Sequence, residues 1–212
     1  MSQRTEGAAR RSERAQAQSE RILRAAQKCF IEHGFHAAGM ALVAKTAGMN
    51  PSLIYRYFPG KSAIILAIVE RQLVHARASI RALHDASDFK ESMIEAFCLW
   101  RDADPDMMNA ALFLEMSAEA SRDPVIAAGL RASDQAIRDE LAAWLSASAA
   151  DGGKGLPPEL ARIRAITLQT FMEGLAIRSL REPDIPLAEL SATVTDFVDR
   201  LFSNPGLGSV TQ

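Results

Sequence analysis

The chain of 212 residues has few cysteines and few aromatic side chains, and it has no long apolar run. With only Cys29 and Cys98 present, a disulfide framework is not expected, and a reducing compartment, the cytoplasm, is favoured. The longest uninterrupted apolar run, residues 63–69, is far shorter than the ~18 residues of a membrane span. The N-terminal segment carries charges with no apolar stretch behind them, so it does not resemble a secretory signal.

Alternating β-branched runs are almost absent, and apolar residues recur at helical spacing throughout the chain. At 48% apolar residues, a chain of this length can bury a stable core. The sequence therefore predicts an all-α fold. The expected helices span about residues 19–34, 40–47, 51–58, 61–83, 88–100, 105–120, 124–146, 158–180 and 186–202.

Capping residues mark many of these helix ends. Gly34 is expected to stop the first helix, which Ser19 is expected to begin, and Gly48 follows the second. Asp88, with Glu91 three residues later, resembles a capping box. A capping residue followed by proline at the first helical position is expected at Asn50-Pro51, Asp104-Pro105 and Asp123-Pro124.

Charge is distributed unevenly along the chain. Residues 1–61 carry ten Lys and Arg against four Glu, whereas residues 62–212 carry 14 basic and 22 acidic side chains. Such a split favours a polyanionic partner at one end of the protein. A solvated basic face without a partner explains the charge equally well.

Both tyrosines of the chain lie in one short segment, "AGMNPSLIYRYFPGK", residues 47–61. Two short helices joined through Gly48 predict a helix-turn-helix over about residues 39–58. Recognition helices read the major groove with their N-terminal residues, and tyrosine hydroxyls bind phosphates. Lys61 opposes the dipole at a helix N-terminus, so it is either a tolerated surface lysine or a phosphate contact. The residues expected to point outward are Pro51, Ser52, Tyr55 and Arg56.

The segment "GFHAAGMALVAKTAGMNPSLIYRYFPGKSAII" resembles the DNA-binding domain of TetR-family transcriptional regulators. The Gly-aromatic pair at residues 34–35, the turn at 47–49, the run at 54–58 and Lys61 match the family pattern in order and spacing. The sequence departs from that pattern at Ala38-Gly39-Met40, where the family often has Thr or Ser. Phosphate contacts at that helix start would then come from backbone N–H groups, or from an arm with Arg10, Arg11 and Arg14.

The resemblance implies a domain organisation and a DNA-facing set. It implies a flexible basic arm over residues 1–15, a DNA-binding domain over 16–76, a ligand-binding and dimerisation domain over 77–204, and a tail over 205–212. It implies a double-stranded DNA operator as partner and homodimer formation, while the lack of a long apolar run predicts no membrane association. The DNA-facing residues that it implies are Met40, Asn50, Pro51, Ser52, Tyr55, Arg56, Tyr57 and Lys61.

The segments "FLEMSAEASRDPVIAAGLRASDQAIRDEL" and "TFMEGLAIRSLREPD" are more loosely similar to the regulatory domains of some TetR-family members, including betaine-regulator-like ones. Met and aromatic residues of the C-terminal two thirds favour an adaptable pocket for a mainly apolar effector, although ordinary core packing explains each residue singly. The candidate effector residues are Met93, Phe97, Trp100, Met108, Glu115, Met116, Phe171 and Glu173. Gln169, Glu115 and Glu173 are polar anchors or exposed positions. The candidate dimer interface comprises Gly174, Leu175, Leu190, Val194, Phe197 and Leu201.

No motif favours catalysis, a cofactor or a metal. The chain has no Gly-rich phosphate loop, no nucleophile elbow and no Glu-x-x-His pair. Cys29, His33 and His36 have spacings that a metal could use, but a fourth ligand is not evident. The sequence therefore predicts a ligand-responsive DNA-binding regulator, a repressor or else an activator, rather than an enzyme. The alternative is an all-α protein that binds a small molecule or metal without binding an operator.

Overall fold

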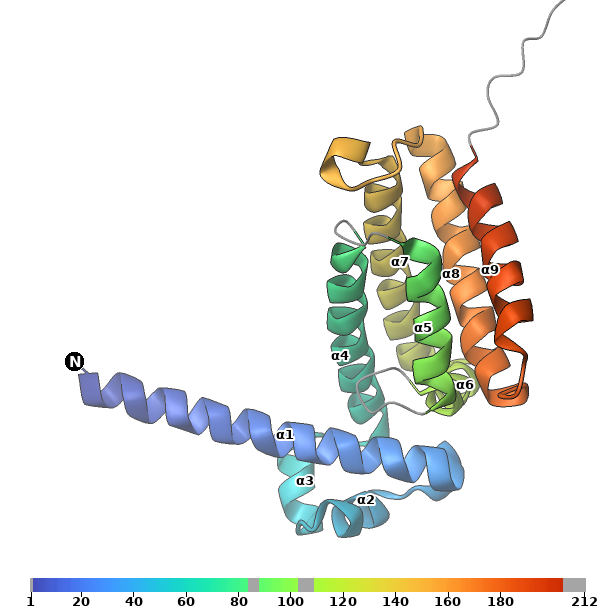
Figure 1. Ribbon diagram of the computed structural model, residues 1–212. Coiled ribbons are helices and arrows are strands. Elements are labelled where there is room, and N and C mark those ends of the chain that lie inside the picture. Colours follow the sequence, from blue (N-terminus) through green and yellow to red (C-terminus); the bar gives the residue numbers. More distant parts are fainter. Residues whose placement is uncertain (1, 84–87, 103–108, 204–212) are drawn as a thin grey trace, which may run out of the picture. The chain divides into compact units, whose positions relative to one another are not determined.

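The computed structural model describes residues 2–83, 88–102 and 109–203, which form nine α-helices and one short 3₁₀ helix without any strand (Figure 1). The all-α fold predicted from the apolar periodicity is therefore confirmed. The helices are α1 (Ser2–Ala37), α2 (Met40–Ala47), α3 (Pro51–Tyr57), α4 (Lys61–Ala82), α5 (Phe89–Arg101), α6 (Ala110–Ala120), α7 (Pro124–Ser146), η1 (Ala149–Asp151), α8 (Pro158–Arg181) and α9 (Leu187–Phe202).

Several predicted capping residues cap helices in the structure. Asn50 Oδ1 accepts the backbone N–H of Ser52 at 3.0 Å, with Pro51 at the first position of α3. Asp88 Oδ1 accepts the N–H of Lys90 at 2.8 Å at the start of α5. Asp123 Oδ1 accepts the N–H of Val125 at 2.8 Å at the start of α7. These caps are confirmed, whereas the predicted Asp104-Pro105 cap lies outside the described residues.

Helix α1 begins earlier than predicted. The helix continues back from Ser19 to Ser2, so the segment predicted as a flexible arm is helical along its backbone. The reason lies in composition, because Ala, Arg, Gln and Glu fill most of residues 2–18 and all favour helix. The predicted stop at Gly34 is confirmed, since φ 73° and ψ 159° at this glycine interrupt the helical geometry.

The described helices belong to two compact units. The first unit contains the chain up to Arg71 together with Ala111–Arg131, and the second contains Gln72–Ala110 and the chain from Ala132 onward. The sequence predicts that one domain ends at residue 76 and the next begins at residue 77. In the structure, the N-terminal unit also includes α6 from Ala111 onward and the first turns of α7. Helices α4 and α7 each contribute residues to both units.

The first unit buries one side of each of its short helices. Val43 of α2 and Ile54 of α3 are fully buried, as are Ile64 and Ile68 in the first turns of α4. On α1 the fully buried positions are spaced as predicted, with Ile22, Ala26, Cys29 and Phe30 between 0% and 1% exposed. These residues fix α2 and α3 through their inner faces and leave their outer faces in solvent.

The second unit has an apolar core built from α5, α7, α8 and α9, with Ile80 of α4. Trp144 lies in this core with its ring 5.1 Å from that of Phe89. The dimer interface predicted on α8 and α9 does not lie on the surface of the chain at four of its positions, Leu175, Leu190, Val194 and Leu201. These side chains already pack inside one chain: Leu175 is 6% exposed, and Leu190, Val194 and Leu201 are 0–1% exposed. Phe197 stacks on Phe171 with ring centroids 3.7 Å apart.

Among the described residues, no single helix is long and apolar enough to cross a membrane. Helices α3 and α4 pass that composition test only as a pair, bent by 55°. The apolar side chains that give α4 this composition, Ile64, Ile65, Ile68 and Val69, are buried in the first unit.

The break at Gly34 gives a direct test of the fold. A Cβ at this position would be tolerated sterically, but φ 73° disfavours any other residue, so Gly34→Ala is expected to destabilise the protein by about 1–3 kcal/mol. Urea unfolding followed by circular dichroism measures the loss of stability. Gly60→Ala is the matched control, because a Cβ there meets nothing within 4 Å and no unusual φ occurs. Equal stability of the two variants would contradict the strained geometry at Gly34.

Candidate functional site

Helix α3 presents a compact polar face to solvent. Ile54, at 0% exposed, and Phe58, at 8%, hold its inner side, while Tyr55 is 53% exposed on its outer side. Pro51, Ser52 and Arg56 are also exposed, and Tyr57 is half-buried. Four of the predicted DNA-facing residues thus share one accessible face, as helical periodicity requires.

The polar groups at the start of α3 bond to each other. Ser52 Oγ donates to Asn50 Oδ1 at 2.9 Å, and the same oxygen accepts the Ser52 N–H. The preceding turn is closed by Gly48 at φ 60°, whose N–H bonds back to Lys45 O at 3.1 Å. Asn50 therefore acts first as a cap, and its side chain holds the helix that carries the tyrosines.

Helix α2 begins without a side-chain cap. Gly39 occupies the capping position with φ −70°, and Met40, in the first turn, is half-buried. The missing hydroxyl noted in the sequence thus leaves backbone N–H groups at the start of α2 without a capping side chain. Met40 itself has an apolar side chain and brings no polar group to this position.

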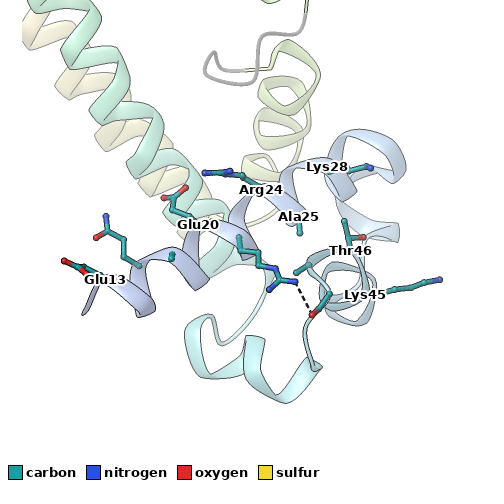
Figure 2. A pocket seen from close by; sticks show the side chains of 12 residues that line it. Glu13, Glu20, Arg24, Ala25, Lys28, Lys45 and Thr46 are labelled. Carbon is teal, nitrogen blue, oxygen red and sulfur yellow. Dashed lines mark hydrogen bonds between the residues drawn. The ribbon is translucent and has the colours of Figure 1, made fainter. Parts of the chain in front are cut away.

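A shallow groove of about 830 Å³ runs between α1 and the C-terminal end of α2 (Figure 2). One wall is formed by Arg21, Arg24 and Lys28 of α1, which recur every three to four residues and so share a helix face. The facing wall includes Lys45 and residues 46–48. The two walls are joined where Arg21 Nη2 donates to Gly48 O at 3.3 Å, the dashed line in Figure 2.

Basic side chains outnumber acidic ones in the lining of this groove. Its lining also contains Glu13 and Glu20, but Glu20 Oε2 accepts from Arg71 Nη1 at 2.9 Å and is thereby neutralised. Lys28 and Lys45 extend outward into solvent in Figure 2, and the Lys28 ammonium lies 3.9 Å from Glu32. Sequence reasoning did not single out these residues, although the spacing of Arg21, Arg24 and Lys28 on one predicted helix carried the signal.

Lys61 contacts the backbone at the end of α1. Its Nζ donates to Phe35 O at 2.7 Å and to His36 O at 3.3 Å, and lies 4.4 Å from the centre of the Phe35 ring. An ammonium group has three N–H donors, so one remains after these two bonds. The phosphate contact of Lys61 therefore stays a prediction. In the structure, Lys61 also binds the carbonyl oxygens of Phe35 and His36.

The predicted effector residues are divided between the two units. Glu115 and Met116 of α6 belong to the first unit, where Met116 is buried and Glu115 Oε2 accepts the N–H of Phe35 at 2.8 Å. Met108 lies outside the described residues. The remaining candidates belong to the second unit, and they are Met93, Phe97, Trp100, Phe171 and Glu173.

Within the second unit, core packing accounts for part of the predicted set. Met93 and Phe97 are at most 1% exposed and belong to the core, and Phe171 packs against it. The indole Nε1 of Trp100 and the side-chain Nε2 of Gln72 are buried donors without a hydrogen-bond partner among the described residues. Buried donors of this kind are normally satisfied by a protein or water acceptor.

A polar cluster joins α7 and α8. Gln169 Nε2 donates to Glu173 Oε1 at 3.1 Å and to Asp134 Oδ1 at 3.3 Å, while Arg138 Nη1 donates to Gln169 Oε1 at 3.3 Å. Burial raises the pKa of the Glu173 carboxyl, and the negative charge of Asp134 raises it further. Burial likewise raises the pKa of Asp134, against the opposing effect of Arg138. One amide therefore bridges two carboxylates that are costly to ionise together.

The residues with metal-compatible spacing have other partners. Cys29 is buried, and its Sγ donates to Thr46 Oγ1 at 3.2 Å. His36 Nε2 lies 3.3 Å from Glu119 Oε2, and His33 Nε2 lies 3.9 Å from Glu32 Oε2. In the part of the chain that the structure describes, no three His, Cys, Asp or Glu side chains are grouped in a way that would hold a metal ion.

Comparison with known proteins gives two family matches. Residues 22–68 match the profile of bacterial regulatory proteins of the TetR family, and residues 91–203 match the C-terminal profile of BetI-type transcriptional repressors. The second match alone spans more than half of the chain.

Individual relatives agree with these profiles. The chain is 34% identical over 132 residues to the HTH-type transcriptional regulator UidR of Escherichia coli K12, covering 60% of this chain and 64% of UidR. The chain thus spans less than two thirds of that relative. The HTH-type transcriptional activator FasR of Mycolicibacterium smegmatis is 27% identical over 69% of this chain and 65% of its own length. The solved structure of Salmonella enterica GusR superimposes with a TM-score of 0.69, 26% identity and coverage of 86% of this chain and 96% of GusR.

The raised pKa of Glu173 predicts how stability depends on pH. Because the folded protein binds this proton more tightly than the unfolded chain does, stability falls as the pH rises from the ordinary carboxyl pKa through the raised pKa of the folded protein. Glu173→Gln is therefore expected to raise the melting temperature at pH 7.5 by about 2 °C, after allowance for partial solvent exposure. The gain should vanish near the ordinary carboxyl pKa of about 4.3.

Thermal unfolding at several pH values, with the exposed Glu95→Gln as control, tests this expectation. A Glu173→Gln gain that persists unchanged at pH 4 would show that the carboxylate charge is not its source.

Proposed function

Because the chain belongs to the TetR family of bacterial regulatory proteins, we propose that it is a transcriptional regulator that binds a palindromic operator as a homodimer and is released by a small-molecule effector. The exposed face of α3, held by its own cap and by Ile54, is the observation that carries this proposal. Operator binding would place the protein in the cytoplasm, as its cysteine content predicts.

Two kinds of DNA contact follow from the position of each residue. Ser52 and Arg56 on the outer face of α3 would meet base edges in the major groove, where arginine recognises guanine. Tyr55, Tyr57 and the remaining Lys61 donor would bind phosphates, which position the helix without specifying sequence. Pro51 and Asn50 would shape the N-terminal end of α3, and Met40 would lie beside the uncapped N–H groups of α2.

The basic groove between α1 and α2 extends the proposed phosphate contacts. Lys28 and Lys45 are exposed and Arg21 is tied to the Gly48 turn, so the basic groups adjoin the segment that leads into α3. Exposed Arg10 and Arg14 continue the basic character along the N-terminal part of α1. Neutralisation of phosphates releases counterions, which makes such binding strongly dependent on salt.

Repression is the favoured mode of regulation. The C-terminal profile that matches residues 91–203 is described as that of a transcriptional repressor. The relative FasR is named as a transcriptional activator, so activation is the second candidate. Both modes require the same DNA contacts and differ in where the operator lies relative to a promoter.

Homodimer formation is proposed through the outer faces of α8 and α9. Ile163 and Ile166 are 62% and 56% exposed on α8, and Leu187 is 51% exposed at the start of α9. Gly174 is exposed on α8, and a Cβ there would meet nothing within the chain, which leaves room for close approach of a second helix. A two-fold dimer would pair two α3 helices with operator half-sites.

The effector is proposed to be largely apolar and to carry a hydrogen-bond acceptor. Trp100 and Phe171, which are only partly buried against the core of the second unit, would supply its apolar contacts, whereas Met93 and Phe97 lie inside that core. The open Trp100 and Gln72 donors would bind an oxygen of the ligand. Effector and operator must then weaken each other's binding by the same factor, commonly about 5–150-fold.

The phosphate contacts are tested by the salt dependence of DNA binding. Lys28→Ala, Lys45→Ala and Tyr57→Phe should weaken binding to specific and scrambled duplexes alike. Each lysine substitution that leaves one phosphate without its partner should lower the slope of log K against log salt by about 0.9. Fluorescence anisotropy at several salt concentrations measures this slope. The control is Arg181→Ala, which removes an exposed arginine of α8. Unchanged slopes in the Lys28 and Lys45 variants would remove the groove from the DNA interface.

The dimer surface is tested by charge insertion. The double variant Ile163→Asp, Ile166→Asp should give monomers in sedimentation velocity and should bind the operator more weakly, because ionised carboxylates resist burial in an apolar interface. The control is Val74→Asp, which changes a side chain of α4 that is 62% exposed. A double variant that remains dimeric places the interface elsewhere.

A further inference from the structure

Helix α1 ends in a turn that leaves a backbone donor without a helical acceptor. Gly34, with φ 73° and ψ 159°, interrupts the helical geometry immediately before Phe35. Buried or half-buried backbone donors need a partner, and the chain supplies one from 80 residues away. The Phe35 N–H donates to Glu115 Oε2 of α6 at 2.8 Å.

The same turn is held from its other side by Lys61. The Lys61 ammonium donates to the carbonyl oxygens of Phe35 and His36, at 2.7 and 3.3 Å. Charged side chains thus bind both backbone groups of Phe35: Glu115 accepts its N–H, and Lys61 donates to its carbonyl oxygen. Hydrogen bonds to charged groups are stronger than those between neutral groups. These residues, 34–36, form the kink near the end of α1 and are called the α1–α2 turn below; α2 begins shortly after them, at Met40.

Further contacts tie α6 to the same part of the first unit. Glu119, four residues after Glu115, is buried, and its Oε2 lies 3.3 Å from His36 Nε2 and 3.4 Å from Arg122 Nη1. Asp123 Oδ2 accepts from Ser62 Oγ at 2.9 Å, and this bond holds the pKa of Asp123 below its usual range. The carboxylates recur every four residues, so one side of α6 and its end faces the α1–α2 turn and the start of α4.

We infer that Glu115 is a positioning residue for operator binding, which fixes the α1–α2 turn and thereby the orientation of the helix-turn-helix. This inference rests on the proposed function. It moves Glu115 from the effector site, where its place in the apolar sequence "ALFLEMS" suggested a ligand anchor, to the support of the DNA-binding helices. Glu115 touches neither bases nor phosphates in this role.

A positioning role for Glu115 and a purely electrostatic role predict opposite changes in operator affinity when its carboxylate is removed. Removing a negative charge near a DNA-binding surface strengthens DNA binding or leaves it unchanged. Loss of the turn support weakens operator binding because α2 and α3 must then be ordered on binding. Glu115→Ala is expected to lower operator affinity about tenfold, equivalent to about 1.4 kcal/mol. Glu115→Gln keeps an acceptor oxygen and should restore most of the affinity.

The experiment uses the full chain and a duplex selected from a random pool by the wild-type protein. Affinities are measured at several salt concentrations for Glu115→Ala, Glu115→Gln and Glu70→Ala, which removes an exposed carboxylate of α4 as charge control. Ile126→Val, at a fully buried position of α7, controls for general loss of stability. The slope of log K against log salt should stay at the wild-type value in Glu115→Ala, because every phosphate keeps its partner.

Hydrogen–deuterium exchange provides a readout that does not depend on DNA. In the free protein, amides of residues 34–39 should exchange faster in Glu115→Ala than in wild type, while Glu115→Gln and Ile126→Val retain slow exchange there. Unchanged exchange at the turn overturns the inference, whatever the affinity. An Ala variant that binds as tightly as Glu70→Ala, or whose salt slope falls, overturns it as well.

The proposed function and this inference fail separately. If the wild-type protein selects no duplex, operator binding is refuted, and the turn support is judged by exchange alone. If the wild-type protein selects a duplex but Glu115→Ala binds it normally, operator binding stands and the positioning role is refuted.

Discussion

The helix-turn-helix depends on a break in α1 that only glycine makes at low cost. At Gly34 the backbone adopts φ 73° and ψ 159°, which ends one helix axis and allows α2 to begin at Met40, shortly after Phe35. A break of this kind leaves unpaired peptide groups, and Glu115 and Lys61 supply their partners. The orientation of α2, and through the Gly48 turn that of α3, therefore follows from how these few backbone groups are satisfied.

The charged side chains of the first unit fall into two groups, those exposed to solvent and those paired within the protein. On the surface of α1 and α2, Lys28 and Lys45 remain in solvent, where they are accessible to the proposed DNA partner. Around the α1–α2 turn, Glu115, Glu119 and Lys61 are engaged with backbone or with neighbouring side chains, and Arg71 neutralises Glu20 beside the basic groove. A count of basic residues in the N-terminal part therefore includes charges that are already paired within the protein, and it does not show which basic side chains lie together on one face.

Local signals in the sequence predicted local structure well. Asn50, Asp88 and Asp123 cap the helices that they were expected to cap, because capping depends on residues two or three positions apart. Apolar spacing also identified the buried side of α1 at Ile22, Ala26 and Phe30. It was misleading for the start of α1, where good helix formers extend the helix beyond a plausible Ser19 cap. It also could not tell whether the stripe of α9 faces its own chain or a second copy, and Leu190, Val194 and Leu201 face their own chain.

At the candidate sites, residue patterns predict which side chains need a partner but not which atoms they bind. A glutamate in an apolar helix needs a polar partner, and the sequence "ALFLEMS" predicts such a partner for Glu115. The sequence does not indicate whether that partner is a ligand, a side chain or a peptide group. The partner is the Phe35 N–H, a donor that exists only because Gly34 breaks a helix 80 residues away. Lys61 poses the same problem, since an uncompensated charge at a helix start is resolved by carbonyl oxygens of another helix. Such pairings follow from the tertiary structure, because neither residue's own neighbourhood in the sequence contains the atom that it binds.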